Sequence, residues 1–87
     1  MEKPDWWDWP FDCENEHLLE RMEIRNFNEA NLREMIEATA LIESGDVSTR
    51  FNLYARYDGD YWKIVVEPDP IDRVVIVVTA FTVPSLP

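Results

Sequence analysis

The chain has 87 residues, a formal net charge of −10 at pH 7 and a hydrophobic content of 46%. This hydrophobic content predicts a folded protein, and the length fits one small domain over residues 1–87. A single cysteine excludes an intramolecular disulfide, and a single histidine excludes a zinc site built from Cys and His. The N-terminus lacks the basic start and apolar run of a signal peptide, and no apolar run reaches the roughly 20 residues of a membrane span. We therefore expect a cytoplasmic protein without membrane contact.

Charge is distributed unevenly along the sequence. Residues 1–49 contain 13 acidic and 4 basic residues, whereas residues 50–87 contain 5 acidic and 4 basic residues. An excess of negative charge repels phosphate backbones at long range, which disfavours tight unaided binding of nucleic acid. The charge favours solubility and basic protein partners, and it directs any polyanion to the nearly neutral second half.

Residues 1–13 form an aromatic and acidic lead. In this lead, aspartates alternate with four aromatic residues: Trp6, Trp7, Trp9 and Phe11. Pro4 and Pro10 disfavour a helix in this segment, so we expect it to be extended. We interpret its aromatic side chains as groups that close a small core. The alternative is a docking arm for a protein partner, because tryptophan is enriched among interface anchors.

Two helices are predicted within residues 14–44. In the first, Leu18, Leu19 and Met22 recur at helical spacing among charged residues. Residues 25–28 indicate a stop and restart, with Asn28 as the N-cap of the second helix. The second helix has the clearer apolar stripe: Leu32, Met35, Ile36, Thr39 and Ala40. Ser44-Gly45-Asp46 is predicted to end it.

From residue 50 the apolar period changes from 3.6 to 2, which predicts strands over 50–57, 61–67 and 73–83. Asp58-Gly59-Asp60 is a compact hairpin signal, and Pro68-Asp69-Pro70 is expected to stop the second strand. The short connections allow only antiparallel neighbours. The predicted fold class is therefore α+β, with two N-terminal helices packed on a three-stranded antiparallel meander. The second helix is expected to press on one set of strand residues: Val74, Ile76 and Val78.

The motifs of several enzyme classes are absent from the sequence. Two glycines cannot build a P-loop or a dinucleotide-binding loop, and no catalytic-triad signature surrounds the serines or Cys13. With 18 acidic residues, pairs of carboxylates occur throughout and identify neither a glycosidase site nor a metal site. We therefore predict no cofactor and no metal.

Two polar constellations could carry chemistry. His17 and Arg21 stand one helical turn apart, which would place a general acid or base beside a phosphate clamp. The alternative is an exposed helix start with weak surface ion pairs. On the first predicted strand, one face collects four polar residues: Arg50, Asn52, Tyr54 and Arg56. Two arginines around a tyrosine suit phosphate contact and base stacking, although the solvated face of an antiparallel sheet alternates in the same way.

The order of motifs from His17 to Phe81 resembles that of a known group of proteins. The motifs are His-Leu-x-x-Arg-Met-x-x-Arg-x-Phe, then Arg-Phe-x-x-x-x-Arg, Trp-x-x-Val-Val-Glu-Pro-Asp-Pro and Val-Val-Thr-Ala-Phe. They resemble small bacterial proteins of the BrnT/RelE-like toxin group, which have the barnase–EndoU–colicin–RelE ribonuclease fold. The strings at 67–70 and 79–81 are the most specific part of this resemblance.

The resemblance implies a site lined by four residues: His17, Arg50, Arg56 and Thr79. It implies metal-independent RNA cleavage, with His17 as base or acid and the two arginines as clamps for the charged phosphorane. Thr79 would be a neutral donor to phosphate. RNA and an antitoxin are the partners that such a bacterial or phage toxin would have.

A second hypothesis comes from the charge. The chain could be a non-enzymatic binding protein, an inhibitor or a nucleic-acid mimic, whose acidic helical face meets a basic partner. A homodimer is compatible with either hypothesis. A cationic cleft on the sheet, ringed by acidic helices, would favour the enzyme. A continuous acidic stripe, with Arg50 and Arg56 held in salt bridges, would favour the mimic.

Overall fold

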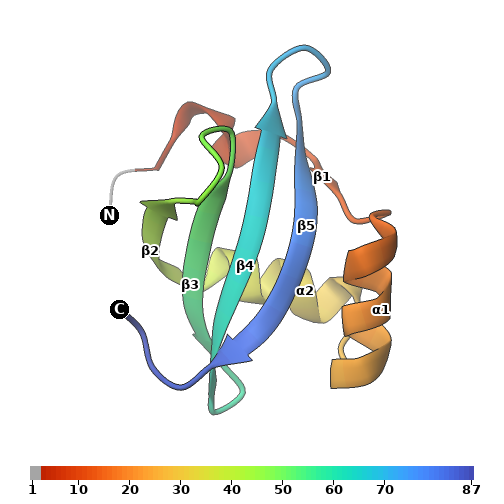
Figure 1. Ribbon diagram of the computed structural model, residues 1–87, viewed down its shortest axis with the longest axis vertical. Helices are drawn as coiled ribbons and strands as arrows, with labels where there is room; N and C mark the ends of the chain where they lie inside the picture. The colour runs from red at the N-terminus through yellow and green to blue at the C-terminus, as the bar shows by residue number, and fades with distance from the viewer. Residues whose placement is uncertain (1–2) are drawn as a thin grey trace.

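The computed structural model describes residues 3–87 (Figure 1). In chain order its elements are the 3₁₀ helix η1 (Asp5–Asp8), β1 (Phe11–Asp12), α1 (Glu16–Arg25), α2 (Glu29–Glu37), β2 (Thr39–Ser44), β3 (Phe51–Tyr57), β4 (Asp60–Asp69) and β5 (Val74–Val83). The α+β class predicted from the sequence is confirmed.

The sheet has five strands in the order β1-β5-β4-β3-β2. Strands β2 to β5 pair antiparallel in sequence order, and β1 pairs parallel with β5. The prediction of a three-stranded meander was therefore wrong, since it missed one strand at each edge. In Figure 1, α2 crosses one face of the sheet and α1 lies beside the β5 edge. Within residues 3–87 the other face carries no helix, and we call it the open face.

Strand β2 replaces the predicted C-terminal half of the second helix. The helix ends at Glu37, and the Thr39 hydroxyl donates to the Ile36 carbonyl over 2.6 Å. Thr39 and Ala40 fitted the helical stripe, but pairing of 39–44 with β3 prevails over this local pattern. Thr39 and the apolar residues that follow it suit a pleated surface as well as a helix.

The aromatic lead is partly extended and partly helical. Pro4 precedes the turn η1, in which the Trp7 N–H donates to the Pro4 carbonyl over 3.0 Å. The chain then extends, and the Val75 N–H donates to the Pro10 carbonyl where β1 begins. Trp6 is buried with its ring centroid 5.2 Å from that of Phe51, so the lead closes the core as expected. Residues 1–2 of the lead lie outside the described residues.

The helix boundaries follow from asparagine caps. Asn15 accepts hydrogen bonds from two backbone N–H groups at the start of α1, and Asn28 forms a reciprocal capping box with Asn31 at the start of α2. Between the helices Asn26 adopts a left-handed conformation with φ of 56°, which asparagine tolerates better than most residues. The predicted stop and restart at 25–28 is confirmed.

The hairpin at Asp58-Gly59 is also confirmed. Both residues have positive φ, 51° and 84°, and the flanking Tyr57 and Asp60 pair directly. Such a two-residue turn with two left-handed residues matches the twist of the strands. Strand β4 continues past its predicted end, because Pro68 pairs with Val75 and Asp69 with Val74. A proline is compatible with a ladder wherever its missing N–H is not required.

The core lies between the helices and one face of the sheet. Leu32, Met35 and Ile36 of α2 are buried in it as predicted. On β5, however, the core residues are Val75, Val77 and Ala80, so the prediction of Val74, Ile76 and Val78 was wrong. A shift of one residue moves every strand side chain to the opposite face, and a continuous Val/Ile run does not reveal which set is buried.

Candidate functional site

A cleft of about 350 Å³ lies on the open face and extends to the start of α1 and the β2–β3 loop. We call it the open-face cleft. Six polar or charged residues are among those that line it: His17, Asp46, Arg50, Asn52, Lys63 and Thr79. The structure thus brings together three of the four predicted site residues, which come from α1, the loop before β3 and β5. The fourth, Arg56, does not line the cleft.

His17 reaches the cleft because α1 packs against β5. Leu18 is fully buried in that packing, and its neighbour His17 is exposed in the first turn of the helix. Asn15 fixes this turn by accepting the His17 N–H over 2.9 Å. Arg21, proposed above as a phosphate clamp beside His17, does not line the cleft.

Thr79 enters the cleft through a β-bulge. Val65 pairs with Thr79 but Val66 pairs with Val77, so Val78 is an extra residue in β5. A bulge bends a strand and re-aims the side chains beside it. Val78 and Thr79 both line the cleft as a result.

Arg50 is held by a tight loop and by one carboxylate. The Gly45 N–H donates to the Arg50 carbonyl over 2.8 Å, and a side chain at Gly45 would meet that oxygen at 3.1 Å. The Arg50 guanidinium donates through Nε to Glu67 Oε1 over 3.2 Å. The Thr49 hydroxyl donates to the same oxygen over 2.9 Å. This ion pair is partly exposed, a class that contributes only about 0–1 kcal/mol, so an anionic ligand can compete for Arg50.

Two residues of the cleft, Lys63 and Asn52, were not among the predicted site residues, although Asn52 belongs to the predicted polar face of the first strand. Lys63 lies opposite Tyr54 in the β3–β4 pairing, and Asn52 lies opposite Val65. Both positions follow from the register that the Asp58-Gly59 turn imposes, which is the signal that could have identified them. Lys63 adds a second cation to the open-face cleft.

Arg56 lies on the same face of β3 but outside the open-face cleft. Its guanidinium carbon is 5.9 Å from the centroid of the Tyr61 ring, its direct partner on β4. Among residues 3–87 the ion pairs of arginine side chains are Arg33 with Glu29 and Arg50 with Glu67. Arg56 is exposed, and no carboxylate among residues 3–87 holds it.

The Thr79 hydroxyl is buried and has no hydrogen-bond partner within residues 3–87. Leaving a buried hydroxyl unpaired costs about 1–3 kcal/mol, whereas an apolar group of the same shape avoids that cost. We expect Thr79→Val to raise the free energy of unfolding by about 1 kcal/mol. Urea denaturation measures this change.

Thr39→Val is the matched control for that prediction. The Thr39 hydroxyl is also buried but donates to the Ile36 carbonyl, so its loss should lower the stability by about 1 kcal/mol. Destabilisation by both substitutions would show that the Thr79 hydroxyl has a partner in the folded protein.

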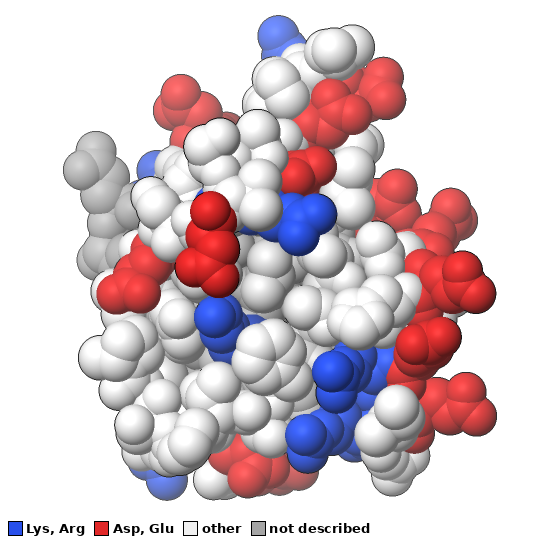
Figure 2. All heavy atoms as spheres, in the orientation of Figure 1, with Lys and Arg blue, Asp and Glu red and all other residues white. Residues whose placement is uncertain are grey.

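Acidic side chains dominate one flank of the molecule, whereas charges of both signs are mixed on the open face (Figure 2). Figure 2 shows acidic side chains along the flank where α1 lies, while Lys and Arg form several separate groups on the open face. In and beside the cleft, Arg50 and Lys63 are accompanied by Asp46 and Glu67. The arrangement is neither the purely cationic cleft expected of an enzyme nor the acidic stripe expected of a mimic. Within residues 3–87, Arg50 is paired with a carboxylate and Arg56 is not.

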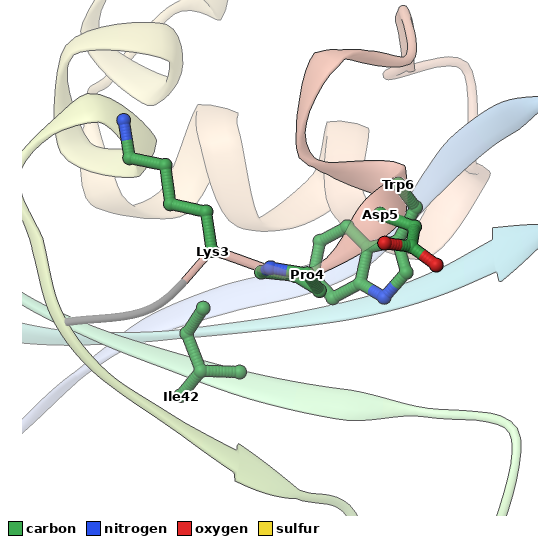
Figure 3. Close-up of a pocket in the computed structure, with 5 residues that line it drawn as sticks. All are labelled: Lys3, Pro4, Asp5, Trp6 and Ile42. Carbon is green, nitrogen blue, oxygen red and sulfur yellow. The ribbon is translucent and has the colours of Figure 1, made fainter.

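A larger hollow, of about 550 Å³, lies at the other edge of the sheet (Figure 3). Trp6 and Pro4 lie on one side of it and Ile42 of β2 on the other. Among the described residues that line it, the charged ones are Lys3 and Asp5, and none is a histidine, serine, threonine or cysteine. We therefore place the candidate site in the smaller open-face cleft, which has the greater range of polar groups.

Cys13 is a poor nucleophile in the folded protein. Burial, with the negative charge of Glu29 as the next cause, raises the pKa of its thiol from 9.0 to about 11. Because the thiolate is the reactive form, iodoacetamide at pH 8 should alkylate Cys13 more slowly in the native protein than in urea. Equal rates, measured by mass spectrometry, would contradict this assignment.

Since the folded state binds the proton of the Cys13 thiol more tightly than the unfolded state does, the stability should also fall as the pH rises from about 9 to 11.

Within residues 3–87 no three metal-ligating side chains come together, and no helix there is long and apolar enough to cross a membrane. No protein-family model matches the chain, and no curated protein or solved structure matches it significantly.

Proposed function

We propose that the protein is a toxin-like, metal-independent endoribonuclease whose active site is the open-face cleft. One observation carries this proposal. His17, Arg50, Lys63 and Thr79 come from four separate segments of the chain and line the same cleft. His17 can transfer a proton, and Arg50 and Lys63 can stabilise the charge that develops on phosphate when a phosphodiester is cleaved by its own 2′-hydroxyl.

The steps can be assigned to the residues of the cleft. His17 takes the proton from the ribose 2′-hydroxyl, and the 2′ oxygen forms a bond to phosphorus. Arg50 and Lys63 stabilise the negative charge that builds on the phosphorane oxygens. The bond from phosphorus to the 5′ oxygen then breaks, and that oxygen takes a proton from an acid. Lys63, whose ammonium group carries protons, supplies this proton. The products are a 2′,3′-cyclic phosphate and a 5′-hydroxyl.

The test is incubation of purified, folded protein with RNA in EDTA, followed by analysis of the fragment ends. We expect cleavage with 2′,3′-cyclic phosphate ends and none in a substrate with 2′-deoxyribose at the cleaved position. Cleavage that EDTA abolishes and Mg²⁺ restores would contradict the mechanism. Growth arrest on induced expression, relieved by a co-expressed antitoxin, would support the biological role.

A second candidate function is supported by the acidic flank. Glu16, Glu20 and Glu23 are all exposed on α1, and Arg50 is already paired with Glu67. These features suit a non-enzymatic inhibitor or nucleic-acid mimic that binds a basic protein. A folded protein that cleaves no RNA but displaces nucleic acid from a basic binding domain would favour this candidate.

A further inference from the structure

Two cation–aromatic pairs stand in successive rows on the open face. Lys63 Nζ is 5.7 Å from the centroid of the Phe81 ring, and the Arg56 guanidinium carbon is 5.9 Å from that of Tyr61. In each pair the cation and the ring are direct partners on adjacent strands: Lys63 pairs with Phe81, and Arg56 pairs with Tyr61. Tyr61 and Lys63 are two residues apart on β4, so both point to the open face.

These rows extend the candidate site toward the β3–β4 hairpin. Lys63 and Phe81 belong to the open-face cleft, whereas Tyr61 and Arg56 lie one row nearer the turn at 58–59. Phe81 on β5 and Tyr61 on β4 are diagonal neighbours, which lie roughly 7–8 Å apart, a distance comparable with one nucleotide of an extended chain. We call the four residues Arg56, Tyr61, Lys63 and Phe81 the β4 track.

We propose that a single strand of nucleic acid binds along the β4 track, with one base stacked on Phe81 and the next on Tyr61. Lys63 and Arg56 meet the phosphates between and beside these bases. This inference names the form of substrate for the proposed ribonuclease and the path by which it leaves the cleft. It gives Arg56 a binding role in place of the catalytic one that the resemblance implies.

A base can take the place of the cation on each ring, because base stacking is the stronger of the two contacts. An exposed cation–aromatic contact changes an equilibrium by about two- to fivefold, while stacking of one base on an aromatic ring changes it by about five- to 150-fold. A base can therefore displace each cation from its ring. The displaced Lys or Arg side chain stays beside the ring, where it can pair with the phosphate of the bound nucleotide.

The chemistry also selects single strands. In a duplex each base is stacked between its neighbours and cannot lie on a protein ring, whereas the bases of a single strand can. The net charge of −10 repels a polyanion, but salt screens exposed charges beyond about 8 Å at physiological ionic strength. Two phosphate contacts would give a shallow salt dependence, with a slope of about −1.4 in log K against log salt.

Fluorescence anisotropy with labelled oligodeoxythymidylate tests the proposal. This probe has no 2′-hydroxyl, so the proposed cleavage chemistry cannot consume it, and binding is measured whether or not the protein is a ribonuclease. We expect wild-type protein to bind it and to bind a duplex of the same length at least tenfold more weakly. Tyr61→Leu, which keeps bulk but removes the ring, should weaken binding by at least about fivefold. Arg56→Ala should weaken it and reduce the salt slope by about 0.7.

Arg33→Ala is the matched control, because it removes the same charge from α2, where Arg33 is paired with Glu29 over 2.9 Å. It should leave the affinity within about twofold, and melting curves establish that every variant is folded. Absence of binding to the wild-type protein, equal binding of duplex and single strand, or wild-type affinity in Tyr61→Leu would overturn the β4 track. Binding without any cleavage of RNA would leave the track standing and remove the proposed ribonuclease activity.

Discussion

Replacing Ile36 by alanine is expected to lower the free energy of unfolding by about 2–5 kcal/mol, the range for a truncated buried aliphatic side chain. Ile36 is 2% exposed and packs in the core between α2 and the sheet. A small domain has a total stability of roughly 5–15 kcal/mol, so the variant would lose a large share of its stability. Urea or thermal denaturation followed by circular dichroism measures the loss.

Ile76→Ala is the matched control, because it removes the same atoms from a residue on the other face of β5. Ile76 is only partly buried and is not a core residue, so its truncation should cost clearly less than that of Ile36. A larger loss at Ile76 than at Ile36 would show that the buried face of the strand has been assigned incorrectly.

Arg50→Ala is expected to reduce RNA cleavage by about 10²–10³-fold, the effect typical of removing one group that stabilises transition-state charge. The fold should persist, because the ion pair with Glu67 is partly exposed and contributes little to stability. Arg50→Lys should restore only part of the rate, since lysine retains the charge but lacks the planar bidentate fork. Single-turnover rates at saturating protein separate this effect from weaker RNA binding.

Glu67→Gln provides the complementary variant. It releases Arg50 from a competing carboxylate while preserving the shape of the side chain, so RNA should bind more tightly. Cleavage of RNA at the wild-type rate by the Arg50→Ala protein would show that Arg50 takes no part in the proposed mechanism.

Local signals in the sequence predicted the structure correctly where an element is determined by its own residues. Asn28 predicted the start of α2, and Asp58-Gly59 predicted the hairpin, because capping and positive φ are properties of single residues and turns. The apolar stripe of Leu32, Met35 and Ile36 also identified the face of α2 that is buried.

The errors arose where distant segments decide the structure. Strand β1 has only two residues and exists because it pairs with β5, which no local pattern reveals. Residues 39–44 fit a helical stripe for two positions, but pairing with β3 makes them β2. The run at 74–78 is apolar at every position, so its period does not reveal which side faces the helices.

The same distinction holds for the candidate site. His17, Arg50 and Thr79 were selected through a family resemblance, and the structure places them on one cleft. Lys63 and Asn52 required the cross-strand register, and the bulge at Val78 that brings Thr79 to the cleft has no signature in the sequence. Arg56 was predicted to share a strand face with Arg50, but Arg50 precedes β3 and five residues lie between the two, so they do not share a cleft.

The most direct test of the proposed activity compares wild-type protein with the double variant His17→Ala, Arg50→Ala on one RNA in EDTA. Both proteins must first give native circular dichroism and cooperative melting. The mechanism predicts cleavage to 2′,3′-cyclic phosphate ends by the wild type and a loss of at least about 10³-fold in the double variant, which lacks both the proton acceptor and one phosphorane clamp. Full activity in the double variant, or no cleavage of any RNA by the folded wild type, would contradict the assignment of a ribonuclease site to the open-face cleft.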